Sequence, residues 1–179
     1  MTLTLAQLDT MPEAEAAFKL AACCGSSRWV AGMVSLRPFT SREKLLAAAD
    51  DVSRTLHPTD WLEAFEHHPR IGERQAGAMV SATAADWSSG EQSASSRATG
   101  DTRAALVEAN AEYEKKFGFI FIICANGRNA SEILVALRDR LSNEPDAEIF
   151  IAAREQQQIT RLRLEKLVPV NRVPGGARP

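Results

Sequence analysis

The sequence predicts an all-α fold, a single-domain multi-helix bundle. Apolar residues recur at helical spacing along most of its 179 residues. Residues that favour helix N-termini precede several of these segments, and no alternating strand pattern of useful length occurs. At roughly 100–200 residues per domain the length fits one domain. We expect that domain over residues 1–168 and a flexible tail, with several prolines and glycines, over residues 169–179.

The first two expected helices are short. A helical turn is predicted over Leu3 to Leu8. Thr10 is a suitable N-cap for the next helix because a threonine hydroxyl accepts backbone N–H bonds, and Pro12 fits its first turn. Gly25 should end this helix. Its expected apolar positions are Phe18, Leu20, Ala21 and Ala22.

Three further helices lead to a pair of histidines. An apolar stretch from Trp29 to Leu36 stops before Pro38, and Thr40-Ser41-Arg42-Glu43 has the pattern of a capping box. Pro58 should start a helix that ends at His67 and His68, since Pro69 forbids another turn. Leu45, Leu46, Ala49 and Val52 should share one face of the helix that this capping box opens, and the helix from Pro58 should carry Trp61, Leu62 and Phe65 to the histidine corner.

The second half of the chain opens with a segment of different composition. Residues 74–100 are rich in Ala, Ser, Thr and Gly, which is typical of a mobile loop or linker. A helix is expected from Asp101, with Gly118 as its stop. Residues 119–124 are apolar, and so short a run is either a strand or a buried extended segment.

Two more helices complete the expected fold. Asn129-Ala130-Ser131-Glu132 is a capping box that should open a helix through Leu141. Asn143 is the expected cap of the last and longest helix, which has Pro145 in its first turn and runs to about Leu167.

Composition narrows the classes of function. The 21 basic and 23 acidic residues are close to balance, which gives no electrostatic case for binding nucleic acid or an anionic membrane. Three cysteines form neither a disulfide framework nor a zinc pattern. The N-terminus lacks the layout of a signal peptide, and no apolar run approaches the ~18 residues of a membrane span. We therefore expect a cytoplasmic protein.

His68 is the first candidate for chemistry. Its side chain has an ordinary pKa close to neutrality, so a histidine fixed at a rigid helix end can donate or accept a proton. The sequence alone leaves open a structural role, because a histidine there also caps carbonyls and interacts with the helix dipole. A metal site formed by His57, His67 and His68 matches no ligand spacing that is known, and we expect none.

The last helix carries a charged residue on its apolar face. A helical wheel of residues 149–167 places Arg163 near the middle of that face, with Gln156 beside it. A buried guanidinium is costly unless it is paired and hydrogen-bonded. Arg163 either extends to the edge or pairs inside the core as a structural residue, or it presents its planar fork to an anionic or carbonyl-rich ligand.

Five segments together resemble the family of 2-oxo-4-hydroxy-4-carboxy-5-ureidoimidazoline (OHCU) decarboxylases. They occur in the family's order and span most of the chain. Any one is weak, but together they are specific. The segments are Trp29-Val30-Ala31 with Arg37-Pro38-Phe39; His68-Pro69-Arg70-Ile71-Gly72-Glu73; Ser88 to Gln92; Asn110 through Tyr113 and Lys116 to Ala125; and Ile159 to Leu164.

The resemblance implies a carboxy-lyase of purine metabolism that decarboxylates OHCU to (S)-allantoin in urate degradation. It further implies an all-helical homodimer that works without a metal or organic cofactor. The family's catalytic histidine corresponds to His68, its functional carboxylate to Glu91 and its arginine to Arg163. The substrate-binding residues implied in addition are Pro69, Ser88, Ser89, Gly90, Gln92, Phe121, Ile122, Ile123, Cys124 and Ala125.

Two other functions stay open at this point. One is a hydrolase or lyase that acts on another ureido compound with the same scaffold. The other is a helical interaction module without catalysis. The alanine-rich stretch between Glu73 and Trp87 also departs from the family's pattern, so the sequence does not show how the segment with Glu91 reaches the pocket.

Overall fold

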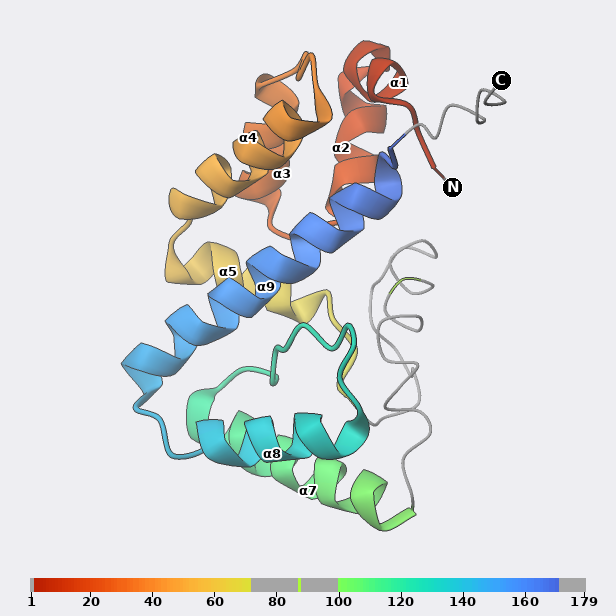
Figure 1. Ribbon diagram of the computed structural model, residues 1–179. Coiled ribbons are helices and arrows are strands. Elements are labelled where there is room, and N and C mark those ends of the chain that lie inside the picture. Colours follow the sequence, from red (N-terminus) through yellow and green to blue (C-terminus); the bar gives the residue numbers. More distant parts are fainter. Residues whose placement is uncertain (1, 72–86, 88–99, 171–179) are drawn as a thin grey trace, which may run out of the picture.

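The computed structural model describes residues 2–71, 87 and 100–170, and over these residues the fold is all-α, without a strand (Figure 1). This confirms the predicted fold class. None of the helices among the described residues is long and apolar enough to cross a membrane. The helices are α1 (Leu5–Thr10), α2 (Glu13–Ala21), α3 (Ser27–Ser35), α4 (Arg42–Arg54), α5 (Pro58–Glu66), α7 (Gly100–Phe117), α8 (Ala130–Arg140) and α9 (Pro145–Leu167).

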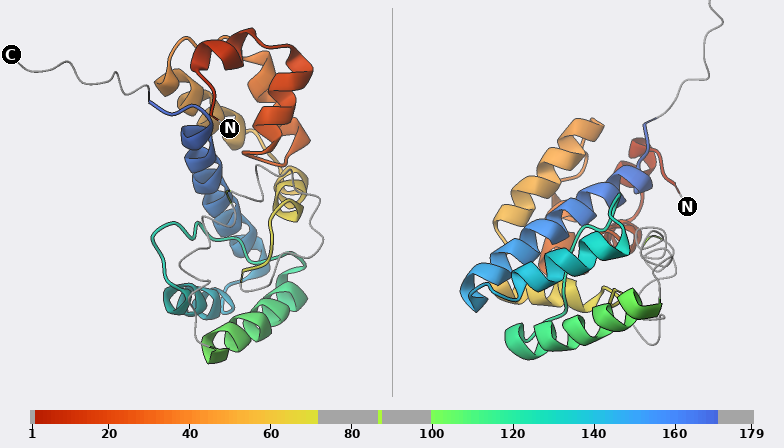
Figure 2. Two further views of the ribbon diagram at one scale, coloured as in Figure 1. Left: turned by 90° about the vertical axis from the view of Figure 1, so that its right-hand side faces the viewer. Right: turned by 60° about the horizontal axis from the view of Figure 1, so that its bottom comes forward.

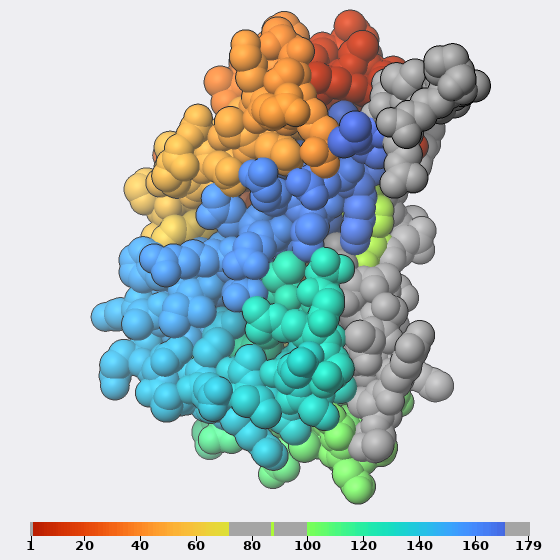
Figure 3. Space-filling view, viewed as in Figure 1, coloured from red at the N-terminus to blue at the C-terminus, as the bar shows by residue number. Residues whose placement is uncertain are grey.

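The longest helix, α9, connects the two ends of the molecule. Figure 2 shows α1 to α4 around its C-terminal part and the α7–α8 pair near its start. In the space-filling view α9 forms a blue band between the orange α4 and the teal α8 (Figure 3). Leu164 and Leu167 of α9 join the core of α1 to α4, whereas Ala152 and Ile159 pack with α5. Residues along this one helix therefore enter two of the three hydrophobic clusters.

The segment between α7 and α8 is extended and buried although it pairs with no strand. Phe121, Ile123 and Ala125 pack into the cluster of α7 and α8. Ile122 and Cys124 pack into the cluster of α5 and α9. This alternation has the two-residue period of extended backbone. It agrees with the expected buried extended segment, and we call residues 121–125 the wall segment because they line the cavity described below.

A buried polar network joins α7, α8 and α9. Glu148 has no exposed surface. Its carboxylate accepts hydrogen bonds from the Tyr113 hydroxyl, from Arg140 Nε at 2.7 Å and from Asn143 Nδ2 at 2.6 Å. Burial, followed by the hydrogen bond to Glu148, raises the pKa of Tyr113, so its hydroxyl stays a donor. The carboxylate is thus paired and hydrogen-bonded, as a buried charge requires.

Several predicted helix boundaries are confirmed. Gly118 follows α7 with φ +78°, a conformation that glycine adopts without strain. The capping box at Asn129 opens α8, with reciprocal bonds to Glu132 of 3.0 and 2.7 Å. Pro58 begins α5, and the apolar stretch from Trp29 to Leu36 overlaps α3, which runs from Ser27 to Ser35. These are sites where the backbone needs a particular residue type, so the sequence predicts them well.

Other helix starts were predicted wrongly by one or two residues. Thr10 is not the cap of α2: it is the last residue of α1, its hydroxyl donates to the Ala6 carbonyl at 2.7 Å, and Pro12 is the N-cap of α2. Ser41, not Thr40, caps α4 by accepting from the Lys44 amide at 3.2 Å. Glu144 takes the cap position of α9, because the Asn143 side chain is used by Glu148. The first helix starts at Leu5, two residues later than predicted, behind a capping box formed by Thr4 and Gln7.

The predicted apolar face of α2 is also wrong in part. Phe18 is 64% exposed and Ala21 is exposed, whereas Ala16 and Leu20 are buried. At about 100° per residue, Phe18 lies some 200° from Leu20 around the helix, so both cannot face the same core. The burial of Leu20 and Ala22 is as predicted.

Two predictions fall largely outside the described residues. The expected loop or linker over residues 74–100 overlaps the described chain only at Trp87 and Gly100, and the expected tail over 169–179 only at Pro169 and Val170. Trp87 is half-buried and packs against the core of α1 to α4. The other residues of these ranges are not part of the described structure.

Replacing Arg140 with alanine should leave the Glu148 carboxylate buried without its cation. We expect the free energy of unfolding to fall by about 3–5 kcal/mol, the usual cost of breaking a buried ion pair. Urea denaturation at pH 7 measures this. The matched control is Arg138→Ala, since Arg138 is exposed on the same helix and should change stability by less than about 0.5 kcal/mol. Equal losses in both variants would contradict a stabilising role for the pair.

Candidate active site

The His68 corner is built by the end of α5. The His67 and His68 amides donate to the carbonyls of Ala64 and Phe65 at 3.3 and 3.0 Å, which closes the last turn. His67 is the C-cap, and Pro69 follows His68. Since proline cannot continue the helix, the chain leaves its axis here and carries the half-buried His68 to a cavity.

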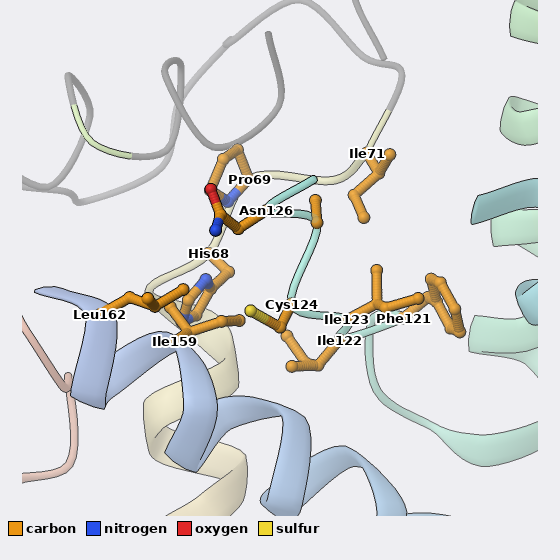
Figure 4. Close-up of a pocket in the computed structure, with 11 residues that line it drawn as sticks. His68, Pro69, Ile71, Phe121, Ile122, Ile123, Cys124, Asn126, Ile159 and Leu162 are labelled. Carbon is orange, nitrogen blue, oxygen red and sulfur yellow. The ribbon is translucent and has the colours of Figure 1, made fainter. Parts of the chain in front are cut away.

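Three parts of the chain line this cavity. Figure 4 shows the His68 corner, the wall segment and α9 meeting around it. The lining residues are His68, Pro69, Ile71, Phe121, Ile122, Ile123, Cys124, Ala125, Asn126, Ile159 and Leu162. The cavity therefore brings together His68, Pro69 and the whole predicted backbone stretch from Phe121 to Ala125, which are distant in sequence.

The surroundings of His68 favour the neutral imidazole. Burial, and then the positive charge of Arg163, lower the pKa of His68 to about 3 from an ordinary value of 6.5. A hydrogen-bonding contribution from Gln156 acts in the opposite direction and does not outweigh them. At neutral pH His68 is consequently an uncharged side chain that can accept a proton.

Arg163 is buried, as the helical wheel predicts. It is 2% exposed, and its Nη1 lies 3.4 Å from the Ala22 carbonyl, to which it donates. Its charge acts on the pKa of both His68 and Cys24. Arg163 is not among the described residues that line the His68 cavity, so its contact with a ligand stays a prediction.

The predicted binding segment Ser88 to Gln92, with the carboxylate of Glu91, is not among the described residues. The roles of its residues in catalysis and binding stay predictions that come from the resemblance alone.

The wall segment is held by side chains that sequence reasoning missed. Arg140 Nη1 donates to the Ile122 carbonyl at 2.8 Å, and the Cys124 amide donates to Glu155 Oε2 at 2.7 Å. The Ala125 carbonyl accepts from the Arg128 amide at 3.0 Å. Three backbone groups of this stretch are thus already used within the protein. No sequence signal singled out Arg140 or Glu155, because each contact joins residues far apart in the chain.

Gly25 is a second residue whose importance the sequence did not show. A Cβ atom at this position would lie 2.4 Å from two ring carbons of His67, well inside van der Waals contact. The missing side chain therefore lets the loop between α2 and α3 pack directly on the residue beside His68. From the sequence, Gly25 is predicted only to end a helix.

The three cysteines lie in the interior. Cys23, Cys24 and Cys124 are buried and form no disulfide. Burial raises the pKa of Cys24 to about 11, which keeps it a thiol at neutral pH. Within the described ranges, no group of three or more His, Cys, Asp or Glu side chains is arranged to hold a metal ion.

The chain is similar to known proteins over most of its length. The family model for OHCU decarboxylase matches residues 9–165. An Arabidopsis thaliana uric acid degradation bifunctional protein is 43% identical over 145 residues, which are 81% of this chain but 45% of that protein. A 2-oxo-4-hydroxy-4-carboxy-5-ureidoimidazoline decarboxylase from Amia calva is 32% identical over 142 residues, 77% of this chain and 78% of that protein.

A solved structure supports the same assignment. A crystal structure of OHCU decarboxylase in the presence of (S)-allantoin superposes with a TM-score of 0.72 at 39% sequence identity, and covers 83% of this chain and 96% of that one. The likeness therefore extends to the three-dimensional fold.

The low pKa of His68 should make stability depend on pH. Because the folded pKa lies below the unfolded value, the stability contributed by neutral His68 is fully present above about pH 6.5 and is lost as pH falls toward 3. The free energy of unfolding should fall with a slope of up to about 1.4 kcal/mol per pH unit from this group.

Urea denaturation at pH 7, 6 and 5 measures this slope. The variant His68→Asn should lose it, whereas the control His57→Asn, at an exposed N-cap, should retain it. Parallel curves for wild type and His68→Asn would show that His68 is not held neutral by the fold.

Proposed function

The chain belongs to the OHCU decarboxylase family, and on this premise we propose that it is a carboxy-lyase that decarboxylates OHCU to (S)-allantoin in urate degradation. The observation that supports this most directly is His68, a neutral imidazole that lines a cavity together with the wall segment. The chain spans 45% of the Arabidopsis bifunctional protein, so only the decarboxylase activity is proposed for it.

The chemistry of the substrate explains why so few protein groups are needed. Its carboxylate stands on a carbon that also carries a hydroxyl and is next to a C=N bond. When the C–C bond to the carboxylate breaks, CO2 leaves and the electron pair moves into the C=N bond, whose nitrogen takes a proton from solvent. The substrate is its own electron acceptor, and our proposal includes no cofactor and no metal.

His68 serves as the general base and then as the acid. The neutral imidazole takes the proton of the substrate hydroxyl, which becomes the carbonyl of allantoin. The imidazolium then delivers this proton to the neighbouring ring carbon on one face, and that step sets the (S) configuration. Because burial and Arg163 disfavour the imidazolium, the proton is released readily to carbon.

Arg163 and Glu91 have supporting roles in this proposal. Arg163 holds carbonyl oxygens of the ring or ureido group and stabilises charge that moves into the ring. A grip on the departing carboxylate would stabilise the ground state and oppose the reaction. Glu91 accepts hydrogen bonds from ureido N–H groups. The remaining contacts are assigned to Pro69, Ser88, Ser89, Gly90, Gln92 and those backbone groups of Phe121, Ile122, Ile123, Cys124 and Ala125 that are not bonded within the protein.

We also propose that the protein acts as a homodimer in the cytoplasm and that it has OHCU as its small-molecule substrate, with no nucleic acid or membrane partner. These points follow from the family resemblance and from the near-balanced charge of the chain. Sedimentation equilibrium at micromolar concentration tests the dimer, and cell fractionation tests the compartment.

The direct test of activity uses OHCU generated by enzymatic urate oxidation. With the purified protein we expect rapid appearance of one enantiomer of allantoin, followed by optical rotation or circular dichroism. Spontaneous decay of OHCU without the protein provides the racemic baseline. A rate and optical signal equal to that baseline would refute the proposal.

Replacing His68 with alanine should remove the stereospecific proton transfer. We expect kcat to fall by about 10²–10⁴-fold, the usual contribution of a positioned acid–base group, with loss of the enantiomeric excess. Helical circular dichroism serves as the check on folding, and His57→Ala is the matched exposed histidine. Full activity in His68→Ala would remove His68 from the mechanism.

The variant Arg163→Lys keeps the charge but loses the planar fork. Because an ammonium group cannot reproduce two parallel N–H donors, we expect kcat/KM for OHCU to fall by about 10²-fold or more. Arg161→Lys, at an exposed position two residues away, is the control. Wild-type kinetics in Arg163→Lys would contradict the assignment of this residue.

A further inference from the structure

The wall segment has a structural problem that the helices do not have. An α-helix satisfies its own backbone hydrogen bonds, and a strand in a sheet shares them with its neighbour. Residues 121–125 are buried, at 2–9% exposure, and extended, yet no strand lies beside them in the described chain. Their N–H and C=O groups therefore need partners outside regular secondary structure, since a buried unpaired backbone group is costly.

Two charged side chains on neighbouring helices supply these partners. Arg140 at the end of α8 donates to the Ile122 carbonyl at 2.8 Å. Glu155 in the middle of α9 accepts from the Cys124 amide at 2.7 Å. Hydrogen bonds to charged groups are shorter and stronger than those between neutral groups. The segment is thus held at Ile122 and at Cys124, the residues directly before and after Ile123.

Arg140 is itself held in place by other residues, and Glu155 belongs to a helix that lines the cavity. Arg140 is bound by the buried Glu148 and lies over the Phe121 ring, 4.6 Å from its centroid. Glu155 is half-buried and stands next to Gln156, the residue that acts on the pKa of His68. One turn further along α9, Ile159 lines the His68 cavity. The anchor of the wall segment and part of the opposite cavity wall therefore belong to one rigid helix.

We propose that Glu155 and Arg140 are positioning residues of the active site: they fix the backbone of Ile122 to Cys124 against the cavity that holds His68. This inference rests on the proposed function, because it assigns the two residues to the binding of the same substrate. Because the Cys124 N–H and the Ile122 carbonyl are bonded to these side chains, they are not available to the substrate. The two bonds also fix the position of the Ile123 backbone, which lies between them.

The role is positioning and not catalysis, so its signature is substrate affinity. Without Glu155 the buried Cys124 amide loses this charged acceptor, and we expect the segment to move relative to α9. A displaced wall weakens contacts made equally in the ground and transition states, which raises KM with a smaller change in kcat.

The test compares three variants of the full chain. Glu155→Ala removes the acceptor, whereas Glu155→Gln keeps a carbonyl oxygen at the same place. Gln158→Ala is the control, since Gln158 is exposed on the same helix. We expect Glu155→Ala to raise KM for OHCU by about tenfold with kcat within about threefold, and Glu155→Gln to restore KM to within about threefold of wild type.

Amide hydrogen exchange supplies a readout that does not depend on catalysis. We expect the Cys124 amide to exchange slowly in wild type, in Gln158→Ala and in Glu155→Gln, and at least about tenfold faster in Glu155→Ala. If the wild type fails to convert OHCU, the proposed function is wrong. The exchange rates of the Cys124 amide still show in that case whether Glu155 holds the wall segment.

Two results would overturn the inference. One is a wild-type KM in Glu155→Ala, together with unchanged exchange at Cys124. The other is a Glu155→Gln variant as impaired in KM as Glu155→Ala, which would mean that the charge acts on the substrate and not through the wall segment.

Discussion

The structure depends on how an all-helical protein accommodates one stretch of extended backbone in its interior. Helices cannot bring backbone donors and acceptors to a ligand from their middle turns, because those groups are bonded within the helix. The wall segment can, and its alternating side chains bury it between the α7–α8 cluster and the α5–α9 cluster. The requirement for hydrogen-bond partners outside the segment then accounts for the positions of Arg140 and Glu155 beside it.

Those charged residues are organised along α9. Glu148 near its start accepts a hydrogen bond from Arg140, and Glu155 in its middle accepts one from the wall segment. The positive charge of Arg163 near its end adds to the effect of burial in lowering the pKa of His68. One helix therefore carries Glu148, which holds Arg140, Glu155, which holds the wall segment directly, and the cation Arg163. Since a helix fixes the spacing of its residues at about 1.5 Å each, the relative placement of these groups is determined by sequence distance along α9.

The sequence predicted the fold class and the burial of Arg163 because both follow from helical periodicity, which is a local property. It predicted Gly118 and the Asn129 cap because these sites demand particular residue types. It misplaced the caps at Thr10 and Asn143, where competing partners decide which side chain is used.

Long-range contacts were beyond the reach of the sequence. Glu155 and the Cys124 amide are 31 residues apart, and Arg140 and Ile122 are 18 apart. Neither residue differs in type or spacing from an ordinary helix-surface charge. The exposure of Phe18 was missed for a related reason: a short helix has more than one possible apolar face, and only packing selects between them.

The contact between Gly25 and His67 has a consequence for how this protein can vary over time. The loop after α2 and the histidine corner are more than forty positions apart in sequence, yet they pack so closely that no side chain fits at Gly25. Because the His67 Cβ would itself lie 2.7 Å from a Cβ at position 25, a larger residue there would require a shift of the loop backbone or glycine at position 67. The two positions should therefore covary among descendants of this chain, so that the history of a remote turn is tied to that of the catalytic neighbourhood.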